Sequence, residues 1–287
     1  MRHHVIVWLV ALFAVALASL VHVSRQTTAR TADGLEDPQV VADRALSLLE
    51  TDANALRPET QKALRAAAVL AEAGAINSAR GAYLLGRQYE REGDFRAAEG
   101  LYKKAIAQEP AWNWPYGSLG NLLVLHSIGR AEEAMGVLQK CITLDPEWGR
   151  PYGIMAVLLR SEKRYEEALA PAELALKYWP DSIVPLNNYA NLLVDLERFD
   201  EAEEYYHRAI ESFPDHPKPY YNLACLYTLI GRKADALANL REAFQRSDAL
   251  RYAALDDTDF ASLKGDSDFE ALVRRNEKTL DFRAGVE

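Results

Sequence analysis

The sequence predicts an all-α protein built from repeated helical hairpins, and three observations support this fold class. From Gly81 to about Ser247, a pattern of small and large apolar residues returns every 34 residues. Four successive copies end on similar phrases, AIAQEP, CITLDP, ALKYWP and AIESFP, whose prolines follow one another at intervals of 36, 34 and 34 residues. Small residues stand five and twelve positions before each proline, where they let two helices approach closely. These small residues are Ala105, Cys141, Ala175 and Ala209, and Ala98, Ala134, Ala168 and Ala202.

Further residues return in the first half of each copy. The equivalent pairs are Leu85-Gly86, Leu119-Gly120, Met155-Ala156, Tyr189-Ala190 and Leu223-Ala224. Together these positions resemble the tetratricopeptide repeat, a helix-turn-helix unit of about 34 residues. The resemblance implies that each pair of short helices, which cannot bury its apolar face alone, stacks on the next pair to form a right-handed superhelical solenoid.

The resemblance covers residues 79–250 and divides them into five repeats. Their ranges are 79–112, 113–148, 149–182, 183–216 and 217–250. The second repeat has two extra residues near LVLHSIGR, and Pro171 falls inside the second helix of the third repeat. Because an interior proline costs a helix about 3 kcal/mol, we expect a local bend and a notch where these two repeats meet. In the fifth repeat Asp248 stands where the closing proline is expected, so the array is predicted to stop there.

Residues 1–25 are predicted to be a single-pass transmembrane signal anchor. The run from Val5 to Val23 has no formally charged residue and is long enough to cross a bilayer, which needs about 20 residues. The alternative is a signal peptide cleaved near Ala18, which would give a secreted chain, but the apolar run continues past that point. Basic residues on both sides leave the orientation open under the positive-inside rule. Since a short basic tail before a first apolar segment usually stays in the cytosol, we expect the repeats on the periplasmic or extracytoplasmic side.

The segments that flank the array have different predicted roles. Residues 26–36 have the polar, small-residue composition of a linker. Residues 37–78 contain two stretches with apolar residues at helical spacing, which predicts a degenerate N-terminal hairpin that shields the end of the stack. Residues 251–287 are predicted to hold the C-terminal capping helices.

Composition narrows the class of partner. The 287 residues have a formal net charge of -9, which makes nucleic acid a poor partner for this surface. The two cysteines, Cys141 and Cys225, fall at packing positions of different repeats, too far apart for a disulfide. Both are therefore interpreted as small core residues.

The sequence contains none of the nucleotide-binding and catalytic motifs GxGxxG, GxxxxGKS/T, GxSxG, HExxH and CxxC. The nearest approach to a metal motif is Glu204 with His207, which has no second copy to complete it and is interpreted as a solvated helix face. We therefore expect no enzyme activity, no cofactor, no metal site and no small-molecule substrate.

The resemblance also predicts a peptide-binding groove. In the family, the first helix of each repeat and the loop before it line a concave face that contacts the ligand. Carried over by register, the groove comprises Tyr83, Arg87, Trp112, Trp114, Asn121, Arg150, Asn187, Asn188, Asn191, Lys218, Tyr221 and Asn222. Asn188 shares one register position with Asn222, and Asn121 shares another with Asn191, which predicts an amide ladder for the backbone of an extended peptide. The alternative is that these asparagines cap or solvate helices.

Two aromatic residues are candidate anchors for a partner. Trp112 and Trp114 flank the entry to the second repeat, and side chains of this size contribute about 2 kcal/mol or more at a binding hot spot. Trp148 and Trp179 stand at comparable loops and are interpreted as packing residues. The lysines and asparagines with which some family members grip a C-terminal carboxylate are not in place, although the basic residues in the groove favour an acidic peptide.

These observations favour a membrane-tethered adaptor that binds an extended segment of another protein in the concave groove, with a role in envelope complex assembly. One alternative is a constitutive structural subunit of a membrane complex, held through its convex face. Another is a regulatory module of a separate enzyme.

Overall fold

The computed structural model describes residues 37–51, 57–127 and 129–274, and within these ranges it contains helices and no strand. The predicted all-helical fold is therefore confirmed for this part of the chain. The predicted anchor at 1–25, the linker at 26–36 and the end of the capping region from 275 onward lie outside the described residues. Across the described ranges, no helix combines the length and the apolar character needed to cross a membrane.

The chain divides into two compact units between His126 and Ser127. We call residues 1–126 unit 1 and residues 127–287 unit 2. The division falls inside the second repeat, within the stretch LVLHSIGR that holds the two extra residues. An irregularity of the sequence thus coincides with the boundary between the units.

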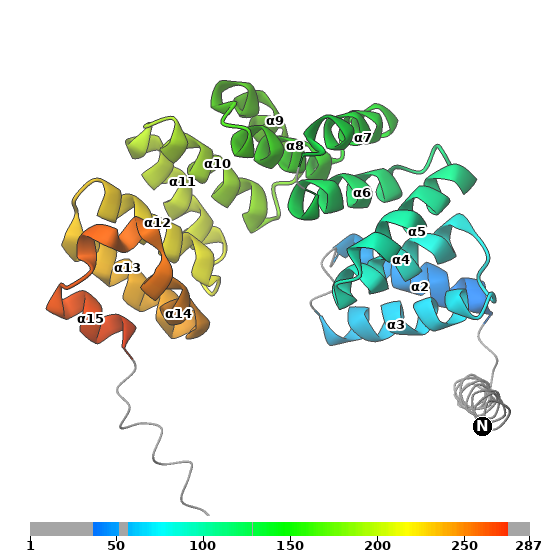
Figure 1. Cartoon of the computed structure of the whole chain (residues 1–287), viewed down its shortest axis with the longest axis horizontal. Coiled ribbons are helices and arrows are strands. Elements are labelled where there is room, and N and C mark those ends of the chain that lie inside the picture. Colours follow the sequence, from blue (N-terminus) through cyan, green and yellow to red (C-terminus); the bar gives the residue numbers. More distant parts are fainter. Residues whose placement is uncertain (1–36, 52–56, 128, 275–287) are drawn as a thin grey trace, which may run out of the picture. The chain divides into compact units, whose positions relative to one another are not determined.

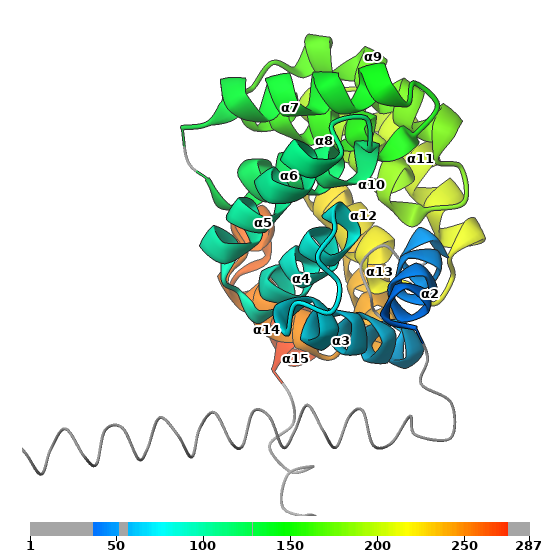
Figure 2. The same ribbon diagram turned by 90° about the vertical axis from the view of Figure 1, so that its right-hand side faces the viewer.

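Unit 1 is a stack of antiparallel helical hairpins (Figure 1). Its described helices are α2 (Pro38–Thr51), α3 (Pro58–Glu72), α4 (Ala79–Glu92), α5 (Phe95–Gln108) and α6 (Asn113–His126). Each helix packs on the next one in the chain, and α2 also packs on α4 (Figure 2). The pair α2 and α3 occupies the range of the predicted N-terminal hairpin. Because α2 and α4 are both first helices of a hairpin, they form one inner face.

Unit 2 continues the same pattern of paired helices (Figure 1). Its described elements are α7 (Ala131–Leu144), α8 (Gly149–Ser161), α9 (Tyr165–Tyr178), α10 (Ile183–Asp195), α11 (Phe199–Ser212), α12 (Pro217–Leu229), α13 (Lys233–Arg246), α14 (Ala249–Asp256), the 3-10 helix η1 (Thr258–Leu263) and α15 (Ser267–Val273). The first helices of successive repeats, α8, α10 and α12, pack directly on one another, and η1 packs on α12. This row of helices and η1 form the inner face of unit 2.

The small residues of the repeat pattern are buried in both units. The positions five and twelve before each closing proline are 0–1% exposed throughout: Ala98, Ala105, Ala134, Cys141, Ala168, Ala175, Ala202 and Ala209. The repeat position eight residues before the closing proline holds a large buried side chain in both units, Tyr102 in unit 1 and Tyr206 in unit 2. These side chains fill the space between the small residues. The packing around these rings is tight, because a Cβ atom added at Gly86 would lie 2.8 Å from the ring of Tyr102.

The interior proline does not break its helix. α9 runs without interruption from Tyr165 to Tyr178 through Pro171. Ala168, Ala172 and Ala175 on the same helix are buried, and their packing holds the helix although proline cannot donate its backbone hydrogen bond.

The turn between the two helices of a repeat needs a left-handed residue at one register position. Glycine supplies it in three repeats, where Gly93, Gly129 and Gly231 have φ of 84°, 78° and 77°. Lys163 and Glu197 adopt φ of 59° at the same position of the third and fourth repeats. A side chain in this conformation costs about 1–2 kcal/mol, so the repeat geometry overrides local preference at these two turns.

Candidate functional site

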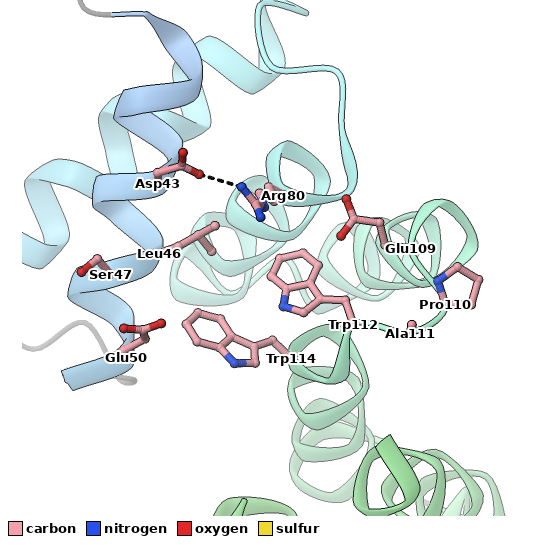
Figure 3. A pocket seen from close by; sticks show the side chains of 10 residues that line it. All are labelled: Asp43, Leu46, Ser47, Glu50, Arg80, Glu109, Pro110, Ala111, Trp112 and Trp114. Atoms are coloured by element: carbon pink, nitrogen blue, oxygen red, sulfur yellow. Dashed lines mark hydrogen bonds and ion pairs between the residues drawn. The ribbon is translucent and has the colours of Figure 1, made fainter. Parts of the chain in front are cut away.

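The inner face of unit 1 holds a cavity of about 810 Å³, which we call the tryptophan cavity (Figure 3). It is lined by Asp43, Leu46, Ser47, Glu50, Arg80, Glu109, Pro110, Ala111, Trp112 and Trp114. These residues come from α2, from the first turn of α4, and from the loop and first turn that begin the second repeat. Figure 3 shows both indole rings pointing into the space beside α2.

The indole pair is held from behind by Tyr83. Its ring meets that of Trp112 edge to face, with centroids 5.0 Å apart, and lies 6.0 Å from the ring of Trp114. The two indole rings are 6.1 Å apart and both side chains are half-buried. Each indole therefore packs on the protein with one side and keeps another side open to the cavity.

Acidic side chains outnumber basic ones around the tryptophan cavity. Arg80 Nη1 lies 2.8 Å from Asp43 Oδ1 and forms an ion pair across α2 and α4. Glu50 and Glu109 also line the cavity, and their carboxylates have no hydrogen-bond or ion-pair partner among the residues that the structure describes. With three carboxylates against one guanidinium, the lining has a formal charge of about -2.

Two residues predicted to line the groove are buried beneath the tryptophan cavity instead. Tyr83 is 3% and Arg87 is 5% exposed. Arg87 Nη1 donates a hydrogen bond to the Tyr83 hydroxyl at 3.2 Å, and Arg87 Nε lies 3.4 Å from the Glu90 carboxylate. The prediction was wrong for these two side chains, because an internal carboxylate and the tryptophan pair enclose them.

The same buried network includes Tyr102. Its hydroxyl donates a hydrogen bond to Glu90, and burial together with that nearby charge raises the pKa of Tyr102 well above its ordinary value. Ser118 on α6 donates to the Tyr83 hydroxyl at 3.3 Å. This network ties α4, α5 and α6 together and supports the tryptophan pair.

The inner face of unit 2 holds a second cavity of about 450 Å³, which we call the asparagine cavity. Its lining comprises Arg160, Asn191, Val194, Asp195, Tyr206, Asn222, Cys225, Leu226, Leu229, Thr258 and Asp259. Most of these residues come from α8, α10 and α12, the first helices of their repeats. Arg160 on α8 forms an ion pair with Asp195 on α10, so the guanidinium in this cavity is charge-balanced.

Two of the predicted ladder asparagines, Asn191 and Asn222, bind each other, and Asn222 also binds the groove residue Asn187. Asn222 Nδ2 donates hydrogen bonds to Asn187 Oδ1 at 3.0 Å and to Asn191 Oδ1 at 3.1 Å. Tyr206 donates a further hydrogen bond to Asn191 Oδ1. These hydrogen bonds join α10 to α12, whereas the sequence-based prediction assigned the ladder amides to the backbone of a bound peptide.

The remaining predicted groove residues are dispersed. Asn121 is half-buried on α6, Arg150 is half-buried on the first turn of α8, and Lys218 is exposed on the first turn of α12. Tyr221 is buried, since its hydroxyl donates to Asp257 at 2.7 Å and its ring meets Phe260 at 5.4 Å. Burial and the hydrogen bond to Asp257 raise the pKa of Tyr221, which belongs to the contact with the C-terminal cap.

The structure adds lining residues that sequence reasoning missed. Arg80 shares the register of Trp114, Arg150 and Lys218, so the repeat pattern contained a signal for it. The α2 residues Asp43, Leu46 and Glu50 had no such signal, because they lie outside the repeats.

Cys225, Asp257 and Asp259 bring possible ligand atoms within 4.8 Å of one another beside the asparagine cavity. Burial and the two aspartates raise the pKa of the Cys225 thiol, so it does not offer the thiolate that a metal prefers. Asp257 already accepts the Tyr221 hydroxyl. These contacts are those of a packed helix junction.

Comparisons with known proteins identify the repeats. Models described as tetratricopeptide repeat match residues 82–111, 116–147 and 181–249, so the chain contains tetratricopeptide repeats. Similar solved structures include PilW, described as a widely conserved type IV pilus biogenesis factor, with 17% identity over 68% of this chain and 98% of that chain and a TM-score of 0.55. A thermophilic tetratricopeptide protein of Thermus thermophilus has 21% identity over 62% of this chain and 98% of that chain, with a TM-score of 0.54. These likenesses show the fold, and no curated protein matches the chain.

Proposed function

We propose that this protein is a membrane-tethered adaptor that binds an extended segment of another protein on the inner faces of its repeats. The observation behind the proposal is that the cavity in each unit is lined by first helices of the repeats and contains residues that the register assigns to a groove. These residues are Trp112 and Trp114 in unit 1, and Asn191 and Asn222 in unit 2.

The two cavities provide complementary ways to hold a peptide. The half-buried indoles in unit 1 offer apolar area to a side chain. In unit 2 the mutual hydrogen bonds orient the amides, and they leave Asn222 Oδ1 as an acceptor and Asn191 Nδ2 as a donor without a partner among the described residues. An amide with one free acceptor or donor can pair with a peptide backbone whatever the peptide sequence.

The tether rests on the sequence. The uncharged run from Val5 to Val23 supports an anchor, and the basic residue before it supports repeats on the periplasmic or extracytoplasmic side. An adaptor in that position has a role in assembling envelope complexes. Alkaline extraction of membranes, followed by protease treatment of intact and of opened cells, tests both parts. Release by alkali argues against the anchor. Digestion of the repeats when the outer membrane is opened and the inner membrane is intact supports the orientation, and protection under that condition argues against it.

Affinity capture of the full-length chain tests the adaptor function. One variant combines Trp112→Ala with Trp114→Ala, and a second combines Asn191→Ala with Asn222→Ala. The matched control combines Tyr252→Ala with Asn239→Ala, which removes an exposed aromatic ring on α14 and an amide on α13, outside both cavities.

A partner that is lost from either cavity variant and kept by the control supports binding on the inner faces. A partner that all three proteins retain transfers the interaction to the convex face or the caps, as expected of a structural subunit. Circular dichroism of each variant verifies that the loss does not come from unfolding.

A further inference from the structure

We propose that the tryptophan cavity recognises a basic side chain, arginine above all, in the segment that the protein binds. This inference rests on the proposed adaptor function and specifies the chemistry of its partner. It differs from the sequence-based expectation of an acidic peptide, which depended partly on Arg87. That guanidinium is buried and paired with Glu90, so it is not available to a ligand.

The aromatic wall suits a planar cation. Trp112 and Trp114 are held by Tyr83 at 5.0 and 6.0 Å, so their rings are fixed before a ligand arrives. Indole is the aromatic side chain that attracts cations most strongly, and a guanidinium can stack flat on it. The methylene stem of an arginine side chain can also contact the indole rings, whereas a small cation has no such stem.

The acidic residues supply the complementary charge. Asp43 is neutralised by Arg80 at 2.8 Å, which leaves Glu50 on α2 and Glu109 before α6 as the uncompensated carboxylates of the lining among the described residues. Figure 3 shows Trp114 reaching toward the part of α2 that holds Glu50, with Glu109 on the side of Trp112. A carboxylate with free oxygens accepts the hydrogen bonds of a guanidinium.

The asparagine cavity provides an internal contrast. There the basic residue Arg160 is paired with Asp195, and no aromatic pair faces the space. The lining also holds the amides of Asn191 and Asn222 and a single further carboxylate, Asp259. Charge selection is therefore assigned to unit 1, and sequence-independent backbone contacts to unit 2.

Fluorescence anisotropy with the full-length protein in detergent tests the inference. The probes are labelled Gly-Ser peptides of equal length that carry several arginines, lysines, glutamines or glutamates. We expect the arginine peptide to bind most tightly and the glutamine peptide to bind about tenfold more weakly or worse, in line with a stacked cation that also meets carboxylates.

Paired substitutions separate local recognition from the overall charge of the protein. Glu50→Gln with Glu109→Gln is expected to weaken the arginine peptide by about tenfold, and Trp114→Leu by about fivefold. Glu204→Gln with Glu211→Gln on α11 changes the net charge equally, outside the cavity, and should alter binding by less than about twofold.

Several results would overturn the inference. Equal binding of the arginine and glutamine peptides, tighter binding of the glutamate peptide, or an unchanged affinity in Glu50→Gln with Glu109→Gln would each do so. Suppose that one of these results is found, but Trp112→Ala with Trp114→Ala still abolishes capture of the partner. The adaptor function then stands, and only the preference for a basic residue fails. If no peptide binds and capture is also unaffected, both proposals fail.

Discussion

The inner faces of unit 1 and unit 2 are both built from the first helices of hairpins, but they expose different chemistry. Unit 1 presents two indoles and two uncompensated carboxylates, whereas unit 2 presents two amides, a neutralised ion pair and the single carboxylate of Asp259. The two tyrosines Tyr83 and Tyr221 share one register position, and each is buried by residues outside its own helix. Register thus places a residue on the inner face, and its neighbours decide whether a ligand can reach it.

The strongest test of the comparison is whether the units are separately stable. Tyr102→Ala and Tyr206→Ala remove equivalent buried rings, and each should destabilise its own unit by about 3–5 kcal/mol. Amide hydrogen exchange should show lost protection in α4 and α5 for the first variant, and in α10 and α11 for the second. As matched controls, Tyr102→Phe and Tyr206→Phe remove only the hydroxyl, and each should lower the free energy of unfolding by about 1 kcal/mol. Equal loss of protection in both units from either variant would mean that they unfold together.

Binding should depend more on unit 1 than on unit 2. Trp112→Ala and Trp114→Ala are each expected to cost about 2 kcal/mol of affinity for the captured partner, against about 1 kcal/mol for Asn191→Ala with Asn222→Ala. Calorimetric titration at two salt concentrations measures both differences. The contribution of unit 1 should weaken more than that of unit 2 as salt rises, because the lining of its cavity has a formal charge of about -2, against about -1 in unit 2. A salt effect confined to the asparagine variants would reverse the assignment.

The turns offer a smaller and more local comparison. Lys163→Gly and Glu197→Gly should each stabilise unit 2 by up to about 1 kcal/mol, since glycine adopts φ of 59° without strain. The reverse change in unit 1, Gly93→Ala, should destabilise it by a similar amount of about 1 kcal/mol, because Gly93 has φ of 84°. Chemical denaturation gives the free energies. Destabilisation by both glycine substitutions would show that the side chains contribute more than the strain.

The smallest expected effect is a pH dependence located in unit 2. His216 is the N-cap of α12, and its Nδ1 accepts the backbone N–H of Lys218 at 3.3 Å, which requires that nitrogen to be unprotonated. Burial and Lys218 lower the pKa of His216 from its ordinary value of 6.5. As the pH falls, the unfolded chain therefore takes up the proton first. The contribution of the His216 cap to the free energy of unfolding is complete above about pH 6.5 and is lost as the pH falls below that value.

Thermal unfolding between about pH 7.5 and 5.5 should show a loss smaller than the roughly 1 kcal/mol of a helix N-cap. His216→Asn keeps a capping side chain without titrating in this range and should remove the dependence. If His216→Asn unfolds with the same pH dependence as the original protein, a group other than His216 is responsible for that dependence. In unit 1, Ser78 caps α4 and should contribute no such dependence.

The helical hairpins and their period follow from local sequence alone, because steric fit at small residues such as Ala98 and Ala202 is a local, repeated requirement. The sequence also placed Trp112 and Trp114 at the entry to the second repeat, where the structure has them. α9 runs without interruption through Pro171 because its buried alanines hold it against its neighbours, and the bend and notch expected there remain a prediction.

Which side chains are accessible depends on contacts between elements that lie far apart in the chain. α2 brings Asp43 and Glu50 opposite tryptophans that follow about sixty residues later, and no local pattern encodes that meeting. Tyr83, Arg87 and Tyr221 stand at groove positions in the repeat, yet burial removes them from a ligand. The physical reason is that a repeat specifies backbone geometry through nearby residues, whereas exposure and charge at a surface depend on whichever distant elements pack against it.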